Sequence, residues 1–139
     1  MIKLSRLSDY AVVVLETLSR DTSLSLSASQ IAIASGLPEP TVAKVLKLMA
    51  SGGLVISSRG VNGGYAMAKK PEDMNVFEII SAIEGRLGLT ACVDGDHESC
   101  ALQGSCAMSG RWDVVNKAVQ KTFESISLAD MTRKDQKAA

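Results

Sequence analysis

Two helix signals separated by a tight turn constrain the fold of this chain more than any other feature. Ser27 and Gln30 form a capping-box pattern, which predicts a short helix after Ser27. Gly36 can adopt the left-handed conformation that ends a helix, and the prolines of residues 38–41 suit the first turn of a longer helix that runs to about Ser51. This order of elements is typical of a helix-turn-helix, whose second helix enters the major groove in DNA-binding proteins.

A hairpin signal follows the second helix. Residues 54–58 and 65–68 are expected to form two short strands, and the residues between them include Arg59 and three glycines. A Gly-rich turn between two short strands indicates a β-hairpin. Directly behind a helix-turn-helix, such a hairpin corresponds to the wing of a winged helix.

Three further segments show the helical spacing of apolar residues. Residues 7–18 form the first, with Ser8 as its N-cap. Asn75 begins a second amphipathic helix that ends near Gly85, and helical spacing returns at residues 109–125. The chain is therefore expected to be mainly α with a small β-hairpin, a winged helix-turn-helix followed by a long C-terminal helix.

Composition fits one domain with an appendage. The chain has 139 residues, of which 46% are hydrophobic, enough for an ordinary core. It opens without the apolar run of a secretory signal and contains no apolar stretch of roughly 18 residues, so we expect a cytoplasmic protein that does not span a membrane. Residues 1–70 hold eight Lys or Arg and four Asp or Glu, whereas residues 71–139 hold seven and eleven. The positive half suits a nucleic-acid partner, although a solvated face has the same charge pattern.

Three cysteines, Cys92, Cys100 and Cys106, are the only ones in the chain. Their odd number excludes a purely intramolecular disulfide framework and favours a metal site. The spacing lacks the two-to-four-residue knuckle of structural zinc sites, so an iron-sulfur cluster is favoured over zinc, with three unrelated buried thiols as the alternative. Three thiolates leave a fourth position for a weaker donor, and His97, the only histidine, is one candidate if it is not simply an exposed loop residue.

DNA contacts are expected from the second helix of the helix-turn-helix and from the wing. Small or polar side chains at the helix N-terminus would face bases or phosphates, and Arg59 would enter a minor groove while flanking glycines let the backbone approach. A solvated charge is the alternative for each of them. The predicted contacts are Glu39, Thr41, Lys44, Lys47, Arg59, Gly60, Asn62 and Gly63. No acid-base pair, nucleophile or phosphate loop suggests an enzyme.

The opening residues 4–11, the run 53–55 leading into 59–65, and the cysteine triplet together resemble the family of winged-helix regulators that includes IscR, NsrR and RirA. The resemblance implies a homodimer whose interface is the long helix around residues 112–123. It also implies a [2Fe-2S] or [4Fe-4S] cluster in each subunit, and a recognition helix and wing that bind half of a near-palindromic double-stranded DNA operator.

One position departs from part of that family. IscR-like members carry a histidine ligand three residues after the third cysteine, where this chain has Ser109. NsrR-like members can use an aspartate at the start of the first helix, supplied by the other subunit, and Asp9 matches that position. The resemblance therefore makes Asp9 of the partner subunit the first candidate for the fourth ligand and His97 the second.

The resemblance also divides the chain. Residues 1–85 would form the winged helix-turn-helix domain, 86–108 the cysteine cluster-binding loop, 109–131 the dimerisation helix and a C-terminal turn, and 132–139 a disordered tail. The expected function is that of a repressor that senses iron-sulfur status through a labile cluster and controls SUF-type cluster assembly or iron genes. A nitric-oxide-sensing repressor, a small iron-sulfur redox protein and a DNA-binding module without a cluster are the alternatives.

Overall fold

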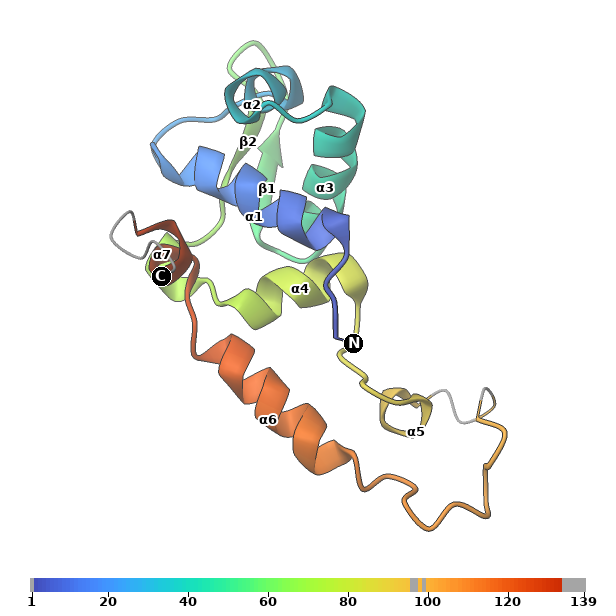
Figure 1. Cartoon of the computed structure of the whole chain (residues 1–139). Helices are drawn as coiled ribbons and strands as arrows, with labels where there is room; N and C mark the ends of the chain where they lie inside the picture. Colours follow the sequence, from blue (N-terminus) through green and yellow to red (C-terminus); the bar gives the residue numbers. More distant parts are fainter. Residues whose placement is uncertain (1, 96–97, 99, 134–139) are drawn as a thin grey trace.

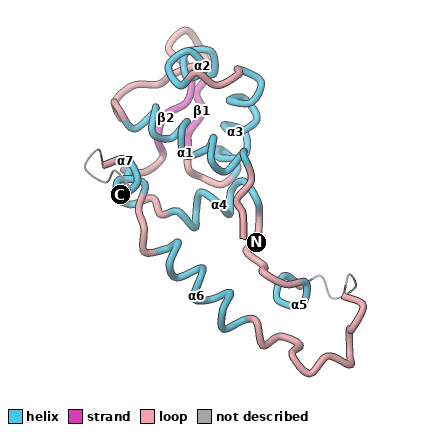
Figure 2. Tube along the Cα trace, in the orientation of Figure 1, coloured by secondary structure: helices cyan, strands magenta, loops and turns pink. Residues whose placement is uncertain are grey.

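The computed structural model describes residues 2–95, 98 and 100–133. Helices predominate, and the only sheet among these residues is a two-stranded antiparallel hairpin (Figures 1 and 2). In chain order the elements are α1 (Arg6–Ser19), α2 (Ala28–Ser35), α3 (Glu39–Ser51), β1 (Val55–Ser58), β2 (Gly64–Met67), the 3-10 turn η1 (Pro71–Asp73), α4 (Val76–Glu84), α5 (Ala91–Asp94), α6 (Asp113–Glu124) and α7 (Leu128–Thr132). The predicted fold class is confirmed.

Local signals set the helix-turn-helix as predicted. The Ser27 hydroxyl accepts a hydrogen bond from the Gln30 N–H at 3.2 Å, and the Gln30 side chain accepts one from the Ser27 N–H at 2.9 Å. Gly36 ends α2 in the left-handed conformation, with φ 77°, and its N–H donates to the carbonyl of Ala32. Proline in the first turn of α3 removes no intrahelical bond, so a sharp change of direction separates the two helices.

One core joins the helix-turn-helix to the helices beneath it. Its members come from α1, α2, α3, α4 and α7 and are nearly inaccessible to solvent: Leu15, Ile31, Leu46, Ile79 and Leu128. Each buried aliphatic side chain of this size contributes roughly 1.5–3 kcal/mol through removal of apolar surface from water. The long segment between α4 and α7 leaves this core and returns to it, because Leu128 is packed inside it.

The hairpin is anchored to the start of α2. Val55 pairs with Met67 and Ser58 with Gly64, in antiparallel register. Leu26 adds a bridge on the outer side of β2, with its N–H and carbonyl both bonded to Tyr65, at 2.9 and 2.7 Å. A Cβ on Gly64 would lie 2.6 Å from the Leu26 carbonyl oxygen, so this close approach requires glycine. The wing is thereby held beside the helix-turn-helix.

The N-terminus of α1 differs from the prediction. Ser5, not Ser8, is the N-cap, and its hydroxyl accepts from the Ser8 N–H at 3.2 Å. Ser8 lies in the first turn instead, almost fully buried, and its hydroxyl donates to the carboxylate of Glu84 at 2.6 Å. Ser5 is the N-cap because, in this arrangement, the Ser8 hydroxyl can make the long-range bond to Glu84. Asp9 occupies the first turn, as expected.

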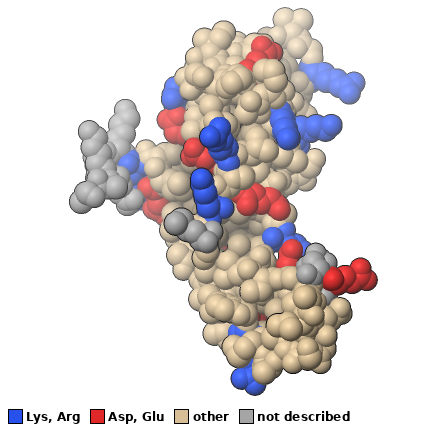
Figure 3. All heavy atoms as spheres, turned by 45° about the vertical axis from the view of Figure 1, so that its right-hand side comes forward, with Lys and Arg blue, Asp and Glu red and all other residues tan. Residues whose placement is uncertain are grey.

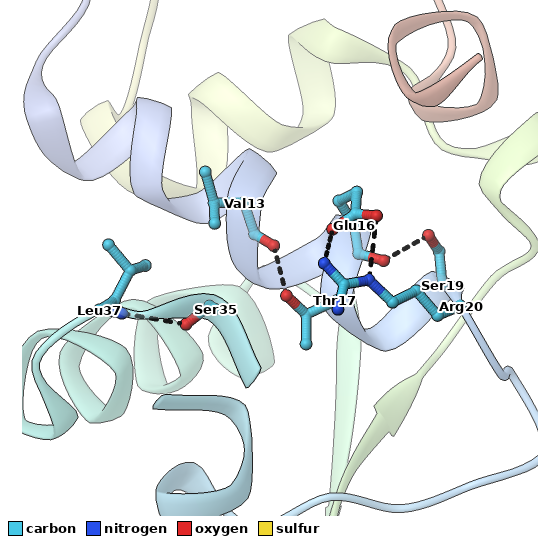
Figure 4. A network of polar contacts seen from close by, with 7 residues as sticks. All are labelled: Val13, Glu16, Thr17, Ser19, Arg20, Ser35 and Leu37. Carbon is cyan, nitrogen blue, oxygen red and sulfur yellow. Dashed lines mark hydrogen bonds and ion pairs between the residues drawn. The ribbon is translucent and has the colours of Figure 1, made fainter. Parts of the chain in front are cut away.

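The last turn of α1 satisfies its polar groups locally (Figure 4). Thr17 is buried and donates its hydroxyl hydrogen bond to the Val13 carbonyl at 2.9 Å. Arg20 forms an ion pair with Glu16 at 2.8 Å, and Ser19 donates to the Glu16 carbonyl at 2.7 Å. The buried threonine therefore costs little, since its donor is paired.

The segment after α4 contains more structure than its sequence indicates. A one-turn helix, α5, forms where no periodicity was visible, and α6 begins at Asp113 rather than near residue 109. Trp112 is the N-cap of α6 and is 46% exposed, so it does not act as a buried residue of the helix within this chain. Figure 1 shows α6 running below α4, away from the helix-turn-helix. The predicted tail, residues 132–139, lies mostly outside the described residues.

Candidate DNA interface and cysteine site

One face of α3 is apolar and buried, and the opposite face carries the predicted DNA contacts. Lys44 and Lys47 are both exposed and are three residues apart, so they lie on the same side of the helix, whereas Thr41 is half-buried. Figure 3, in which the side of α3 is turned forward, shows Lys and Arg side chains projecting from the upper part of the molecule. This face can therefore offer positive charge to a phosphate backbone.

Glu39 has a contact of its own in the protein. Its carboxylate accepts a hydrogen bond of 3.0 Å from the hydroxyl of Ser29 in α2. The bond joins the first turns of the two helices and helps to set the angle between them. A base contact by Glu39 stays a prediction, and any such contact shares the carboxylate with Ser29.

The wing tip projects into solvent. Arg59, Gly60 and Asn62 are exposed, and Gly63 is half-buried. The Gly63 N–H donates to the Gly60 carbonyl at 3.0 Å, and a Cβ on Gly63 would approach the Ser58 carbonyl oxygen to 2.6 Å. The tight turn thus needs glycine for space, while Arg59 is free to point toward a ligand.

The three cysteines converge on one small cavity. Cys92, Cys100 and Cys106 are half-buried free thiols that line a space of about 30 Å³, although seven residues lie between the first and the second and five between the second and the third. Ser109, at the position where IscR-like members carry histidine, lines the same cavity. The remaining lining residues are Leu102 and Gln103. The chain therefore folds its only thiols toward a common point.

A cavity of this volume holds roughly one water molecule. Among the described residues, no three His, Cys, Asp or Glu side chains are arranged to hold a single metal ion. The donor set, three thiolates on an irregular loop, fits an iron-sulfur cluster, and the loop has to open to admit it.

Cys92 has the most distinct environment of the three. The Thr90 hydroxyl, 3.2 Å from the Cys92 sulfur, lowers the pKa of this thiol, and a hydrogen bond from the Gly110 backbone lowers it further. A lowered pKa favours the thiolate, which is the form that ligates metal. The environment of Cys92 is therefore compatible with a role as a metal ligand.

The two candidates for the fourth ligand differ in what can be said of them. Asp9 is exposed in the first turn of α1 and borders an apolar groove of about 240 Å³ formed by α1, α4 and α7. It is not among the residues that line the cysteine cavity, and a ligand role for Asp9 of the partner subunit stays a prediction. His97 lies outside the described residues.

Two residues that the sequence patterns did not single out hold the cysteine loop at its root. Asn116 of α6 is buried, and its amide bonds to the backbone of Leu87 and Leu89. Glu84, the last residue of α4, bonds to the first turn of α1. Asn116 could have been noticed in the sequence, because it is a polar residue one turn after Trp112 on the helix face expected to be apolar. No local sequence feature points to the role of Glu84.

A winged helix-turn-helix with a further C-terminal helix defines a class of DNA-binding transcription regulators, and comparisons with known proteins place the chain in it. A family model described as "Rrf2: Iron-dependent Transcriptional regulator" matches residues 4–134. The chain belongs to the Rrf2 family, and it is a DNA-binding transcription regulator rather than an enzyme.

Three similar proteins match this chain over most of its length. The chain is 31% identical to the HTH-type transcriptional regulator NsrR of Bacillus licheniformis, over 84% of this chain and 80% of that one. The structure of T. potens IscR is 29% identical in sequence and has a TM-score of 0.69, over 99% of this chain and 93% of that one. The structure of CymR, the global cysteine regulator of B. subtilis, has a TM-score of 0.71 over 95% of this chain and 97% of that one. At 23% identity this likeness shows a shared fold alone. None of the described helices is long and apolar enough to cross a membrane.

Proposed function

We propose that this chain is a homodimeric repressor that senses iron-sulfur status through a labile cluster held by Cys92, Cys100 and Cys106. The convergence of all three thiols on one cavity carries the proposal. When bound, an iron-sulfur cluster supplies the chemically labile group whose loss is the signal. Three strong ligands and a replaceable fourth would make that loss easier than in an all-thiolate site.

The DNA-binding part of the proposal rests on α3 and the wing. Lys44 lies on the exposed face of α3 and suits a base edge, Lys47 one turn later suits a phosphate, and Arg59 suits a minor groove. In a two-fold dimer each subunit would bind one half of a near-palindromic operator. These residues belong to the predicted domain 1–85, and the core beneath them is formed mostly by that part of the chain, with Leu128 of α7 added to it.

The dimer part of the proposal rests on α6. Trp112 and Val115 are one turn apart at the start of α6 and are 46% and 43% exposed, and Val114, on a neighbouring side of the helix, is 77% exposed. A second copy of the chain would cover these apolar side chains. The same dimer would have to bring Asp9 of the partner subunit to the cysteine cavity, as its fourth ligand.

Contacts at the start of α1 favour a link between cluster and DNA. Glu84 ends α4, just before the cysteine loop, and accepts hydrogen bonds from Ser5, the N-cap of α1, and from Ser8, which directly precedes Asp9 in the first turn. A change at the loop or at Asp9 would therefore act on α1. Because α1 packs against α2 and α3, the placement of the recognition helix would respond.

Anaerobic purification of the full chain tests this function. We expect a coloured protein that contains iron and sulfide in the amounts of one cluster per subunit. Its affinity for the operator should change when the cluster is lost. Cys92→Ser, Cys100→Ser and Cys106→Ser should each lose iron, whereas Ser109→Ala, on the same cavity, should keep it. A colourless, iron-free protein that binds its operator tightly would contradict the sensor function and would indicate a DNA-binding module without a cluster.

Control of SUF-type assembly or iron genes is the proposed role of such a regulator. A nitric-oxide-sensing repressor is the second candidate. Exposure of the cluster-bound protein to nitric oxide and, separately, to an iron chelator, with operator affinity as the readout, decides between the two signals.

A further inference from the structure

The side-chain amide of Asn116 on α6 holds the backbone segment that leads to Cys92. Asn116 is only 6% exposed. Its Oδ1 accepts a hydrogen bond of 3.1 Å from the Leu89 N–H, and its Nδ2 donates one of 3.0 Å to the Leu87 carbonyl. Because one bond needs an acceptor and the other a donor, an amide of this length can make both and a carboxylate cannot.

The segment held by Asn116 touches both ends of α5, which carries Cys92. Thr90 follows the segment directly, is the N-cap of α5, and has its hydroxyl 3.2 Å from the Cys92 sulfur. Gly88 lies against the other end, since a Cβ at this position would be 2.4 Å from the Cβ of Asp94. A displacement of the segment would therefore move α5 and the Cys92 thiol with it.

We infer that Asn116 is a positioning residue that holds Cys92 at the cysteine cavity, so that the helix proposed to form the dimer interface also sets the geometry of the cluster site. The inference rests on the proposed function, because it assigns Asn116 a role in cluster retention. It adds a residue of α6 to a site whose other members all lie in the cysteine loop or on α1.

The test compares Asn116→Ala with Gln120→Ala in the full chain, with and without its cluster. Gln120 is the matched control, since it lies on α6 one turn later and bonds only within the helix, to Glu124. Amide hydrogen exchange should become roughly tenfold faster at residues 87–94 in Asn116→Ala, while α1 to α3 and α6 stay protected. The cluster should also be lost several-fold faster from this variant, and Gln120→Ala should match the wild type in both measurements.

Three results would overturn the inference. Exchange and cluster loss could both equal those of Gln120→Ala, or exchange could rise at 87–94 without faster cluster loss. Exchange could also rise equally throughout the chain, which would mean a general loss of stability. If Asn116→Ala does not fold, Asn116→Asp replaces it: this variant keeps the shape and the acceptor for Leu89, loses the donor to Leu87 and adds a negative charge opposite that carbonyl. If the wild type takes up no cluster, the proposed function fails, while the exchange comparison still decides whether Asn116 holds the Cys92 segment.

Discussion

Glu84 and Ser8 join the two ends of the DNA-binding unit through a hydrogen bond of 2.6 Å from the Ser8 hydroxyl to the Glu84 carboxylate. The same oxygen accepts a second bond, of 2.8 Å, from the Ser5 N–H. Glu84 is the last residue of α4, and Ser8 stands in the first turn of α1. The start of the first helix is thereby tied to the root of the cysteine loop.

Removal of this carboxylate should loosen the start of α1. Glu84→Ala leaves the buried Ser8 hydroxyl without its acceptor, and we expect the free energy of unfolding to fall by about 1–2 kcal/mol, at the lower end because Glu84 is largely solvated. Glu84→Gln should lose less, since an amide oxygen can accept both bonds. Urea unfolding measures the difference, with Glu124→Ala, which breaks only an exposed bond within α6, as the control. A loss in Glu124→Ala as large as that in Glu84→Ala would contradict the expectation.

The Glu84 contribution should depend on pH. The Ser8 hydroxyl and the Ser5 N–H hold the pKa of Glu84 below its ordinary value of 4.5 in the folded protein. A carboxyl with a depressed folded-state pKa adds stability that is complete above the unfolded pKa and disappears as pH falls through the folded one. The stability difference between wild type and Glu84→Gln should therefore be constant from pH 7 to about 5 and shrink below 4.5. A difference that grows on acidification would refute this assignment.

Gly64 should tolerate substitution less well than Gly60. Both have positive φ, 150° and 106°, but a Cβ on Gly64 would also meet the Leu26 backbone, whereas Gly60 has open space around it. Backbone strain costs on the order of 1–3 kcal/mol at either site, and the clash adds to it at Gly64. Thermal unfolding of Gly64→Ala and Gly60→Ala tests the order. Equal losses would show that the bridge between Leu26 and Tyr65 does not hold the wing.

Lys44 and Lys47 should affect DNA binding in different ways. If Lys47 contacts a phosphate, Lys47→Ala should weaken binding to all sequences alike and reduce the salt slope by about 1. If Lys44 faces base edges, Lys44→Ala should also change the sequences selected from a random DNA pool. Lys70→Ala, at an exposed position outside α3, the wing and α6, is the charge-matched control. The interface is misplaced if the control weakens binding as much as either variant.

Local signals in the sequence predicted most of the fold, since capping needs only neighbours. Ser27 with Gln30, and Asn75 before α4, act within one turn and were identified correctly. The Ser5 cap was missed because Ser8 offers the same chemistry three residues later, and only the distant Glu84 distinguishes the two.

The cysteine region was harder for the same reason. α5 spans one turn and shows no periodicity, and Asn116 gains its meaning from backbone groups 27 and 29 residues away. Residue types and their number predicted a metal site, yet the convergence of Cys92 with the other thiols depends on those long-range bonds. Spacing alone could not show it.

Operator affinity of the anaerobically purified chain, measured before and after cluster removal at one salt concentration, tests the central claim most directly. We expect a change of roughly fivefold or more between the two states. Cys92→Ser, which lacks the cluster from the start, should bind with the affinity of the cluster-free wild type. An iron-free wild type, or equal affinities in a chain that does hold a cluster, would contradict a switch built on the three cysteines.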